Sequence, residues 1–367
     1  MTGPKTTVVP DLETYPLSQL KSLIGISPEA PREIQLKIQK LVHHHQGAFR
    51  FDDWLGNPKT EVAINIVLGT HPISLPMYGA SCEKREVINA QINKWLEQDV
   101  IKPSKSPWAA PVVIVYWNGK PRFCVDYQKL NAVTAPDEFP IPCQLEILQA
   151  LSGAQVLSTL DTLAGFNQLN LAESHQEKTG FHSHWGLHQF KWLPFGLRNG
   201  PSVFQRVMQG ILAPFLWIFS LVYIDDIIIY SQMYEDHLVH LEKVLQVIKE
   251  AHITLSLKKC HFTYTSILLL GQKVSQLGLS THHEKVQAIT DLATLSNVQS
   301  LQGFLGMAIY FLHYILGHTS LVSLLFELLK AKSKWYWGSE QEEAFTSIKL
   351  ALTVAPVLGH PIQGSPF

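Results

Sequence analysis

The stretch Ser220-Leu-Val-Tyr-Ile-Asp-Asp-Ile-Ile-Ile-Tyr-Ser231 places two adjacent carboxylates between two short apolar segments. Segments rich in β-branched residues are typical of strands, so Asp225 and Asp226 are expected at the tip of a hairpin. An acidic pair fits poorly in a core, because burying unpaired charge is costly. It suits a hard cation such as Mg²⁺, which prefers carboxylate oxygens and substrate phosphates. The alternative is a solvated turn, since Asp is a common turn residue.

A third carboxylate follows another candidate strand, because Val156-Leu-Ser-Thr-Leu-Asp ends on Asp161. Enzymes that transfer phosphoryl or nucleotidyl groups use two metal ions roughly 3.5–4 Å apart, and two such ions need several carboxylates. Asp161, Asp225 and Asp226 are therefore the predicted metal ligands. An aspartic-protease loop is excluded, because Leu163 stands where that loop requires Gly and the sequence holds no second copy.

Eight blocks of the sequence carry a family resemblance. They are Ile101–Val113, Arg122–Asn131, Leu157–Phe166, Leu193–Gln205, Tyr223–Asp226, Leu257–Phe262, Leu269–Ser275 and Ala344–Leu358. In this order they resemble the reverse transcriptase of a gypsy-class LTR retrotransposon, part of its Pol polyprotein. The likeness covers about residues 60–367.

The resemblance implies an α+β fold of the right-hand polymerase type, in which an antiparallel palm sheet packs on helices. The expected parts are an N-terminal approach segment (1–75), fingers (76–155), a palm with the reverse transcriptase catalytic core (156–275), a thumb (276–330) and the start of a connection or RNase H-like region (331–367). That last region is expected to be truncated, because the sequence ends at Phe367 before RNase H carboxylates would appear.

Local patterns predict several elements independently of the resemblance. A hairpin is expected over Trp108–Val125, because Asn118-Gly119 is a strong two-residue turn signal. Residues 276–330 are expected to be mainly helical. Apolar residues recurring near the helical period predict helices over Pro31–His45, Glu83–Gln98, Gln205–Leu212 and Asp236–His252.

The resemblance also assigns roles around the carboxylates. Asp161 and Asp225 are expected to bind two Mg²⁺ ions directly, with Asp226 close by and Mn²⁺ as an alternative ion. The backbone carbonyl of Thr162 is expected to reach the second ion. Lys259 matches a family lysine near the triphosphate, where it would act as a proton donor to pyrophosphate.

Further residues are assigned to the nucleotide and to the primer. Lys120 and Arg122 are expected to face the triphosphate, although Arg122 could instead be a surface charge on a strand. Phe166 matches the steric gate that excludes a ribose 2′-OH, and its alternative is a core aromatic. The residues expected to shape the nucleotide pocket are Phe195 and Gly196. Those expected at the primer and template are Tyr223, Leu270, Gly271 and Gln272, of which the last three could form an ordinary strand with a glycine bulge.

Composition bounds the class of protein. The sequence is 46% hydrophobic and 16% charged, which permits a packed core and excludes a disordered chain. The apolar stretches 211–230 and 307–329 contain charged residues, so membrane spans are not expected. Four scattered cysteines without a secretory signal favour a reducing compartment. The expected location is therefore intracellular, and the resemblance implies either the cytoplasm, in a retrotransposon particle, or the nucleus.

The charge balance is unusual for a nucleic-acid polymerase. The net charge is −1, and no arginine follows Arg206. In 276–330 the only lysines are Lys285 and Lys330, so weak contact between thumb and duplex is expected.

The predicted function is RNA-directed DNA polymerisation with dNTPs on a primed RNA or DNA template. The alternative is a degenerate, catalytically weak retroelement remnant that at most binds nucleic acid. Flanking protease, RNase H and integrase domains of a polyprotein are further expected partners.

Overall fold

The computed structural model describes residues 23–49, 56–117, 119–151, 153–269, 272–275, 278–281, 291–292, 295–309, 318–330 and 335–353. The chain divides into two compact units. One comprises Met1–Pro142 and Val156–Tyr264, and the other comprises Cys143–Gln155 and Thr265–Phe367. These units are not the expected fingers, palm and thumb, whose boundaries stay predictions.

The first unit is built on a five-stranded sheet, here called the carboxylate sheet. Its strand order is β1-β12-β6-β11-β10. The strands are β1 (Gly25–Ile26), β12 (His261–Tyr264), β6 (Val156–Asp161), β11 (Asp226–Ser231) and β10 (Ser220–Tyr223). The pairs β12–β6, β6–β11 and β11–β10 are antiparallel, whereas β1 pairs with β12 in parallel. A strand from near the N-terminus thus completes one edge of the sheet.

The central strands of this sheet are buried on both faces. Ile227, Ile228 and Ile229 of β11 are fully buried, as are Leu157 and Leu160 of β6. This explains why the sequence after Asp226 is a continuous apolar run, since a strand covered on one face only would alternate.

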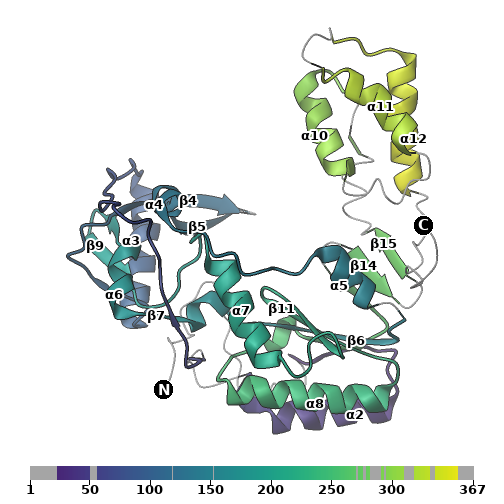
Figure 1. Cartoon of the computed structure of the whole chain (residues 1–367), viewed down its shortest axis with the longest axis horizontal. Coiled ribbons are helices and arrows are strands. Elements are labelled where there is room, and N and C mark those ends of the chain that lie inside the picture. The colour runs from purple at the N-terminus through teal and green to yellow at the C-terminus, as the bar shows by residue number, and fades with distance from the viewer. Residues whose placement is uncertain are drawn as a thin grey trace. The chain divides into compact units, whose positions relative to one another are not determined.

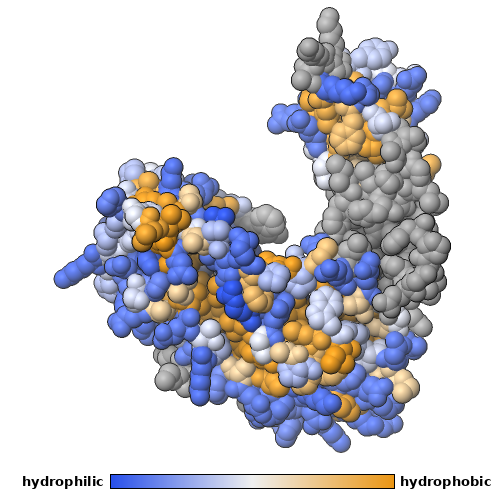
Figure 2. Space-filling model, in the orientation of Figure 1, coloured by the Kyte–Doolittle hydropathy of each residue, from blue (hydrophilic) through white to orange (hydrophobic). Residues whose placement is uncertain are grey.

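Three long helices accompany the carboxylate sheet: α2 (Arg32–His44), α7 (Gly200–Leu212) and α8 (Tyr234–Glu250). Helix α8 packs against β11 and α2, and α7 packs against β10 and α8. Figure 1 shows α2 and α8 running side by side. Their outward surface is largely hydrophilic in Figure 2, while Leu241, Leu245 and Ile248 of α8 are buried in the core.

The same unit contains a second five-stranded sheet with the order β3-β9-β8-β4-β5. Its strands are β3 (Ile101–Pro103), β9 (Gly186–Phe190), β8 (Phe181–Ser183), β4 (Ala110–Trp117) and β5 (Lys120–Val125). Helix α3 (Cys82–Glu97) packs on β3, β4 and β5, and α4 (Gln128–Val133) follows β5. The smaller elements are β2 (Glu61–Val62), β7 (Asn170–Leu171), α6 (Glu173–Gln176) and the 3-10 turns η2 (Gln46–Ala48), η3 (Gly165–Gln168), η4 (Glu177–Thr179) and η5 (Leu257–Lys259).

The second unit has its own sheet and helices. Strands β13 (Ser266–Leu269), β14 (Gln272–Ser275) and β15 (Gly278–Thr281) form an antiparallel sheet. The helices are α5 (Gln144–Ala150), α10 (Val298–Ile309), α11 (His318–Glu327) and α12 (Ser339–Thr353). The rings of Phe304 in α10 and Phe345 in α12 meet edge to face at 4.7 Å, so an aromatic pair joins these two helices.

The structure confirms most of the predicted elements. The hairpin turns between Trp117 and Lys120, and α2, α3 and α8 match their predicted ranges within two residues. Two expectations need correction. Helix α7 begins at Gly200 and not at Gln205, because Pro201 is tolerated in a first helical turn. Residues 278–281 form a strand and not a helix, because pairing with β14 satisfies their backbone.

No helix in the described part of the chain has the length and apolar character that crossing a bilayer requires.

Candidate active site

The predicted hairpin is present, and its tip meets the end of a neighbouring strand. Tyr223 pairs with Asp226 across β10 and β11, which leaves Ile224 and Asp225 as a two-residue turn. In the next ladder Asp226 lies directly opposite Asp161, the last residue of β6. Residues opposite each other in antiparallel strands have Cβ atoms about 4.5–5.5 Å apart. The fold therefore brings all three predicted carboxylates together at one end of the neighbouring strands β6 and β11.

Burial makes the charge of these carboxylates unfavourable. Burial, together with the charges of Asp161 and Asp226, raises the pKa of Asp225 to about 6, against a hydrogen bond from Thr162 that lowers it. Burial also raises the pKa of Asp161 and of Asp226 above their ordinary values, and Lys259 opposes both shifts. Such a cluster of desolvated acids favours protons or cations.

Lys259 is the cation that the fold places beside this cluster. It ends η5, and its Nζ lies 3.3 Å from Oδ1 of Asp161. Its side chain is 66% exposed, so the ammonium group can also reach a ligand in solvent. The backbone of Asp161 is fixed separately, because Ser256 N donates to its carbonyl at 2.9 Å. The position beside the carboxylates fits the expected role, and proton donation itself stays a prediction.

The segment after β6 wraps closely around Asp225. Thr162 Oγ1 donates to Asp225 Oδ1 and Thr162 N donates to the Asp225 carbonyl, both at 3.3 Å. Ala164 adopts a left-handed conformation with φ 48°. At Gly165 a Cβ atom would lie 2.8 Å from Asp225 Oδ1 and 2.6 Å from Thr162 Oγ1. Only glycine allows this approach, so the loop holds the carboxylate from one side.

Phe166 begins an aromatic wall next to the carboxylates. Its ring centroid lies 5.1 Å from that of Phe195 and 5.5 Å from that of Phe204. Phe166 is nearly buried, whereas Phe195 is 57% exposed. Phe166, the predicted steric gate, is therefore a neighbour of Phe195, the predicted pocket residue. The exposed ring of Phe195 remains accessible to a ligand.

Gly196 follows Phe195 in a left-handed conformation, with φ 90°. A Cβ atom there would meet only ordinary contacts with Tyr127 and the Val125 carbonyl, so the backbone angle and not space requires glycine. Asn131 Nδ2 donates to the Gly196 carbonyl at 2.8 Å. The contact with the Val125 carbonyl shows that the end of β5 lies close to this loop. Lys120 and Arg122 are exposed residues earlier on the same strand.

The donor chemistry of the three aspartates fits a hard divalent cation. Oδ1 of Asp161 is buried, and its cationic neighbour is the Lys259 ammonium group at 3.3 Å. Carboxylate oxygens of this kind are the ligands that a hard divalent cation prefers. Among the described residues, however, no three His, Cys, Asp or Glu side chains form a preset metal site. The three aspartates lie at one end of the neighbouring strands β6 and β11 without converging on one point.

Comparison with known proteins decides the family. A family model described as reverse transcriptase (RNA-dependent DNA polymerase) matches residues 102–309. The chain belongs to the reverse transcriptase family. It is 31% identical over 95% of its length to the retrovirus-related Pol polyprotein from transposon opus of Drosophila melanogaster. It is 34% identical over 68% of its length to the Pol polyprotein from transposon gypsy of the same species. The match spans 37% and 25% of those polyproteins, so this reverse transcriptase corresponds to a part of each.

Solved structures establish the fold of this reverse transcriptase. The foamy viral protease–reverse transcriptase in complex with double-stranded DNA matches with a TM-score of 0.86 at 24% identity, over 97% of this chain and 75% of that one. The same viral protein in complex with an RNA/DNA hybrid matches with a TM-score of 0.81 at 23% identity, over 97% and 48%. The predicted right-hand polymerase fold is thereby confirmed.

Some predicted contacts of the reverse transcriptase lie outside this site. Leu270 and Gly271 are not among the described residues, and Gln272 is described only as the first residue of β14. Tyr223 ends β10 and lies beside the turn formed by Ile224 and Asp225. The roles of these four residues at the primer and template stay predictions.

Two polar arrangements around α7 were not recognised in the sequence. On one side Gln205 reaches the hairpin, with Nε2 donating to the Val222 carbonyl at 2.9 Å. A signal was present, because Gln205 lies on the buried face of an apolar helix, between Phe204 and Met208.

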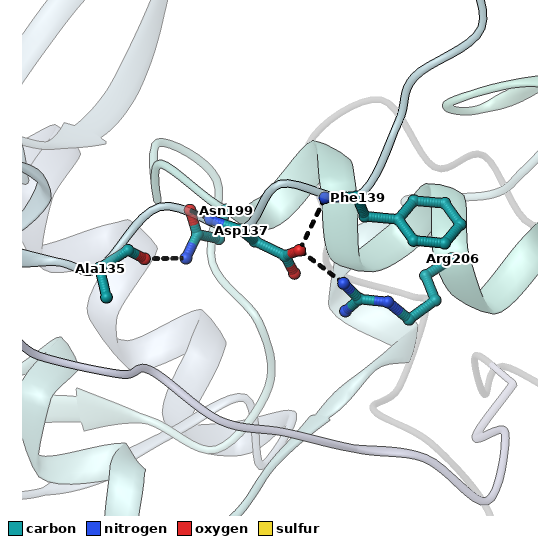
Figure 3. A network of polar contacts seen from close by, with 5 residues as sticks. All are labelled: Ala135, Asp137, Phe139, Asn199 and Arg206. Atoms are coloured by element: carbon teal, nitrogen blue, oxygen red, sulfur yellow. Dashed lines mark hydrogen bonds and ion pairs between the residues drawn. The ribbon is translucent and has the colours of Figure 1, made fainter.

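On the other side α7 holds the segment that leads away from α4 (Figure 3). Arg206 forms an ion pair with Asp137 at 2.5 Å, and its guanidinium lies 4.7 Å from the centre of the Phe139 ring. Asn199 Nδ2 donates to the Ala135 carbonyl at 2.8 Å, while Asp137 N donates to Asn199 Oδ1. Arg206 is thus committed to a structural contact, which lowers the number of arginines that can bind phosphate.

Proposed function

We propose that this chain is an RNA-directed DNA polymerase domain that adds dNTPs to a primer 3′-OH on an RNA or DNA template. The observation that carries the proposal is the register of β6 and β11, which sets Asp161 opposite Asp226 with Asp225 in the adjoining turn. Family membership and the right-hand fold support it.

Asp161 and Asp225 would hold two Mg²⁺ ions, with Asp226 close by and the Thr162 carbonyl available to the second. Bound in this way, the ions would stabilise the attacking and leaving oxygens of the phosphoryl group. Their positive charge would also offset the burial and the neighbouring negative charges that raise the pKa of Asp225.

The protein's own groups divide the remaining work. Lys120 and Arg122 extend from β5 and would grip the triphosphate. Phe166, backed by Phe204, would close the space beside the sugar, while Phe195 contacts the nucleotide. Lys259, close to Asp161, would donate a proton to the departing pyrophosphate.

The wider setting is also proposed. Template–primer would be the partner, and protease, RNase H and integrase domains would flank the chain in a Pol polyprotein. Its location would be intracellular, in a cytoplasmic retrotransposon particle or the nucleus.

Primer extension on an RNA template tests the proposal. The unsubstituted chain should extend a labelled DNA primer with Mg²⁺, and Asp161→Asn or Asp225→Asn should abolish extension. Asp236→Asn is the matched control, because Asp236 is an exposed aspartate at the start of α8. A folded chain that binds template–primer without extending it would instead support the degenerate remnant.

A further inference from the structure

The turn that carries Asp225 is conformationally strained. Ile224 has φ 53°, in the left-handed region that β-branched residues rarely adopt. In this region the Cβ atom of an L-residue lies too close to the following carbonyl oxygen. Such a conformation persists only where the surrounding structure imposes it.

Gln205 supplies the contact that imposes it. The Ile224 N–H donates to Gln205 Oε1 at 2.6 Å, and Gln205 Nε2 donates to the Val222 carbonyl at 2.9 Å. Gln205 is fully buried on α7. Both ends of one amide are therefore used by backbone groups on either side of Tyr223.

The opposite side of the turn is held by β6 and its loop. Thr162 Oγ1 donates to Asp225 Oδ1, and the absence of a side chain at Gly165 lets the loop lie close to that carboxylate. The turn is consequently held between the Gln205 amide and the Thr162–Gly165 loop. Release of either contact would allow Ile224 to relax and Asp225 to turn.

We propose that Gln205 is a positioning residue that keeps Ile224 in its strained conformation and so aims Asp225 at the metal ions. This inference rests on the proposed function, since it assumes that Asp225 binds a cation. Gln205 is fully buried and bonds to the backbone of the turn, so it would act through Asp225 and not as a ligand itself. Its effect is on how far the carboxylates are preorganised before a cation binds.

The test compares two buried glutamines. Gln205→Met removes the side-chain amide with little change in side-chain length. Gln176→Met is the control, because it removes a buried amide whose Nε2 donates to the Leu171 carbonyl, away from the aspartates. Two properties are measured without turnover. These are Mn²⁺ binding, followed by electron paramagnetic resonance, and hydrogen exchange of peptides that cover 220–231.

Gln205→Met should weaken Mn²⁺ binding roughly tenfold, equivalent to about 1.4 kcal/mol, and should speed exchange in the turn. Gln176→Met should leave both unchanged. Equal effects of the two substitutions, or unchanged binding and exchange in Gln205→Met, would overturn the proposal.

A second substitution tests the strain itself. Glycine adopts φ > 0 readily, so Ile224→Gly should form the turn without help from Gln205. The loss of Mn²⁺ affinity caused by Gln205→Met should shrink to roughly twofold in the Ile224→Gly background, as expected for coupled neighbours. An undiminished loss there would contradict the positioning role.

If Gln205→Met does not fold, the double variant decides. Recovered folding and Mn²⁺ binding in Gln205→Met/Ile224→Gly would support the proposal, and no recovery would refute it. Failure of the unsubstituted chain to bind Mn²⁺ would instead refute the proposed metal site. Hydrogen exchange of the turn in the unsubstituted chain and in Gln205→Met would then still test whether Gln205 holds the turn.

Discussion

At the scale of single residues, Asp225 occupies a position that is unfavourable for its own charge. Its pKa is raised to about 6 in the fold, mainly by burial, whereas the unfolded value is the ordinary 3.8. The folded state therefore binds the proton more tightly, and the ionised carboxylate destabilises the fold increasingly as the pH rises from about 4 through 6. Above about pH 6 the ionised Asp225 carboxylate destabilises the fold to its full extent unless a cation binds.

We predict that Asp225→Asn raises the midpoint of thermal unfolding of the metal-free protein at pH 7.5. At pH 4 the carboxyl group is largely protonated, so the difference should disappear. Mg²⁺ should raise the midpoint of the unsubstituted protein more than that of the variant, by mass action. Differential scanning calorimetry checks this, with Asp236→Asn as the control. A lower midpoint for Asp225→Asn at both pH values would show that the bond from Thr162 dominates.

Phe166 gives a second prediction at this scale, concerning choice of sugar. A smaller side chain removes the expected clash with a ribose 2′-OH, so Phe166→Val should improve incorporation of rNTPs relative to dNTPs by roughly tenfold or more, the size of a small-group discrimination. The measurement is the ratio of kcat/KM for the two nucleotides.

Phe181→Val is the matched control, because Phe181 is a fully buried phenylalanine of the second sheet. It should reduce stability without changing the sugar ratio. If Phe166→Val keeps its activity and the ratio stays constant, Phe166 is only a core aromatic.

At the scale of elements, one histidine of α8 joins the two strands that carry the aspartates. His237 Nε2 shares a hydrogen bond with Ser158 of β6 at 2.7 Å, and its Nδ1 shares one with Ser231 of β11 at 2.8 Å. Burial, and to a smaller extent the charge of His240, lowers the pKa of His237 to about 3. The imidazole is neutral in the fold and supports the register that sets Asp161 opposite Asp226.

We predict that His237→Leu destabilises the protein by about 2 kcal/mol, because Ser158 and Ser231 each lose one buried hydrogen bond at about 1 kcal/mol per bond. Their other partners, Thr263 N and His240 Nδ1, remain. The sign of the pH effect follows from the lowered pKa. Between the unfolded value of 6.5 and about 3, the unfolded state binds the extra proton, so stability falls as the pH falls through this range.

Urea unfolding at pH 7.5 and pH 5 checks this prediction. The variant should lose less stability than the unsubstituted protein between the two pH values. His184→Gln, at an exposed histidine, serves as the control. A variant with the same pH dependence as the unsubstituted protein would mean that His237 does not control acid sensitivity.

The sequence predicts some parts of this site well and others poorly, for a physical reason. Period and turn signals act over a few residues, so the hairpin tip at Asp225 and the end of β6 at Asp161 could both be predicted. Gln205 acts through backbone groups 17 and 19 residues away in the chain, and His237 joins the nearby Ser231 to Ser158, which is 79 residues away. Their side chains satisfy distant backbone and hydroxyl groups, and only the folded arrangement identifies those partners.

At the scale of the whole molecule, the distribution of basic residues limits how nucleic acid can be held. Lys330 is the only Lys or Arg in the described part of 276–330, and it pairs with Glu327. Arg206 is likewise engaged by Asp137. Phosphate contacts are therefore expected from other residues, with Lys120 and Arg122 on β5 as the first candidates.

We predict a shallow dependence of template–primer affinity on salt, with a slope near −0.9 for each phosphate contact. Lys120→Ala and Arg122→Ala should each reduce the slope by about one contact. Fluorescence anisotropy across a salt series measures it, with Lys37→Ala and Lys330→Ala as controls for paired lysines. A steep slope that only Lys330→Ala reduces would show that the main phosphate contacts come from the predicted thumb, residues 276–330.

The parallel pairing of β1 with β12 has a consequence for biosynthesis. Gly25 pairs with His261, so the sheet edge cannot close until a ribosome has added more than 230 further residues. At about 5–20 residues per second this delay is roughly 12–50 seconds. Throughout that interval the nascent N-terminal segment lacks its partner strand. Slower translation of the middle of the chain would lengthen this exposure without altering a single contact of the finished protein.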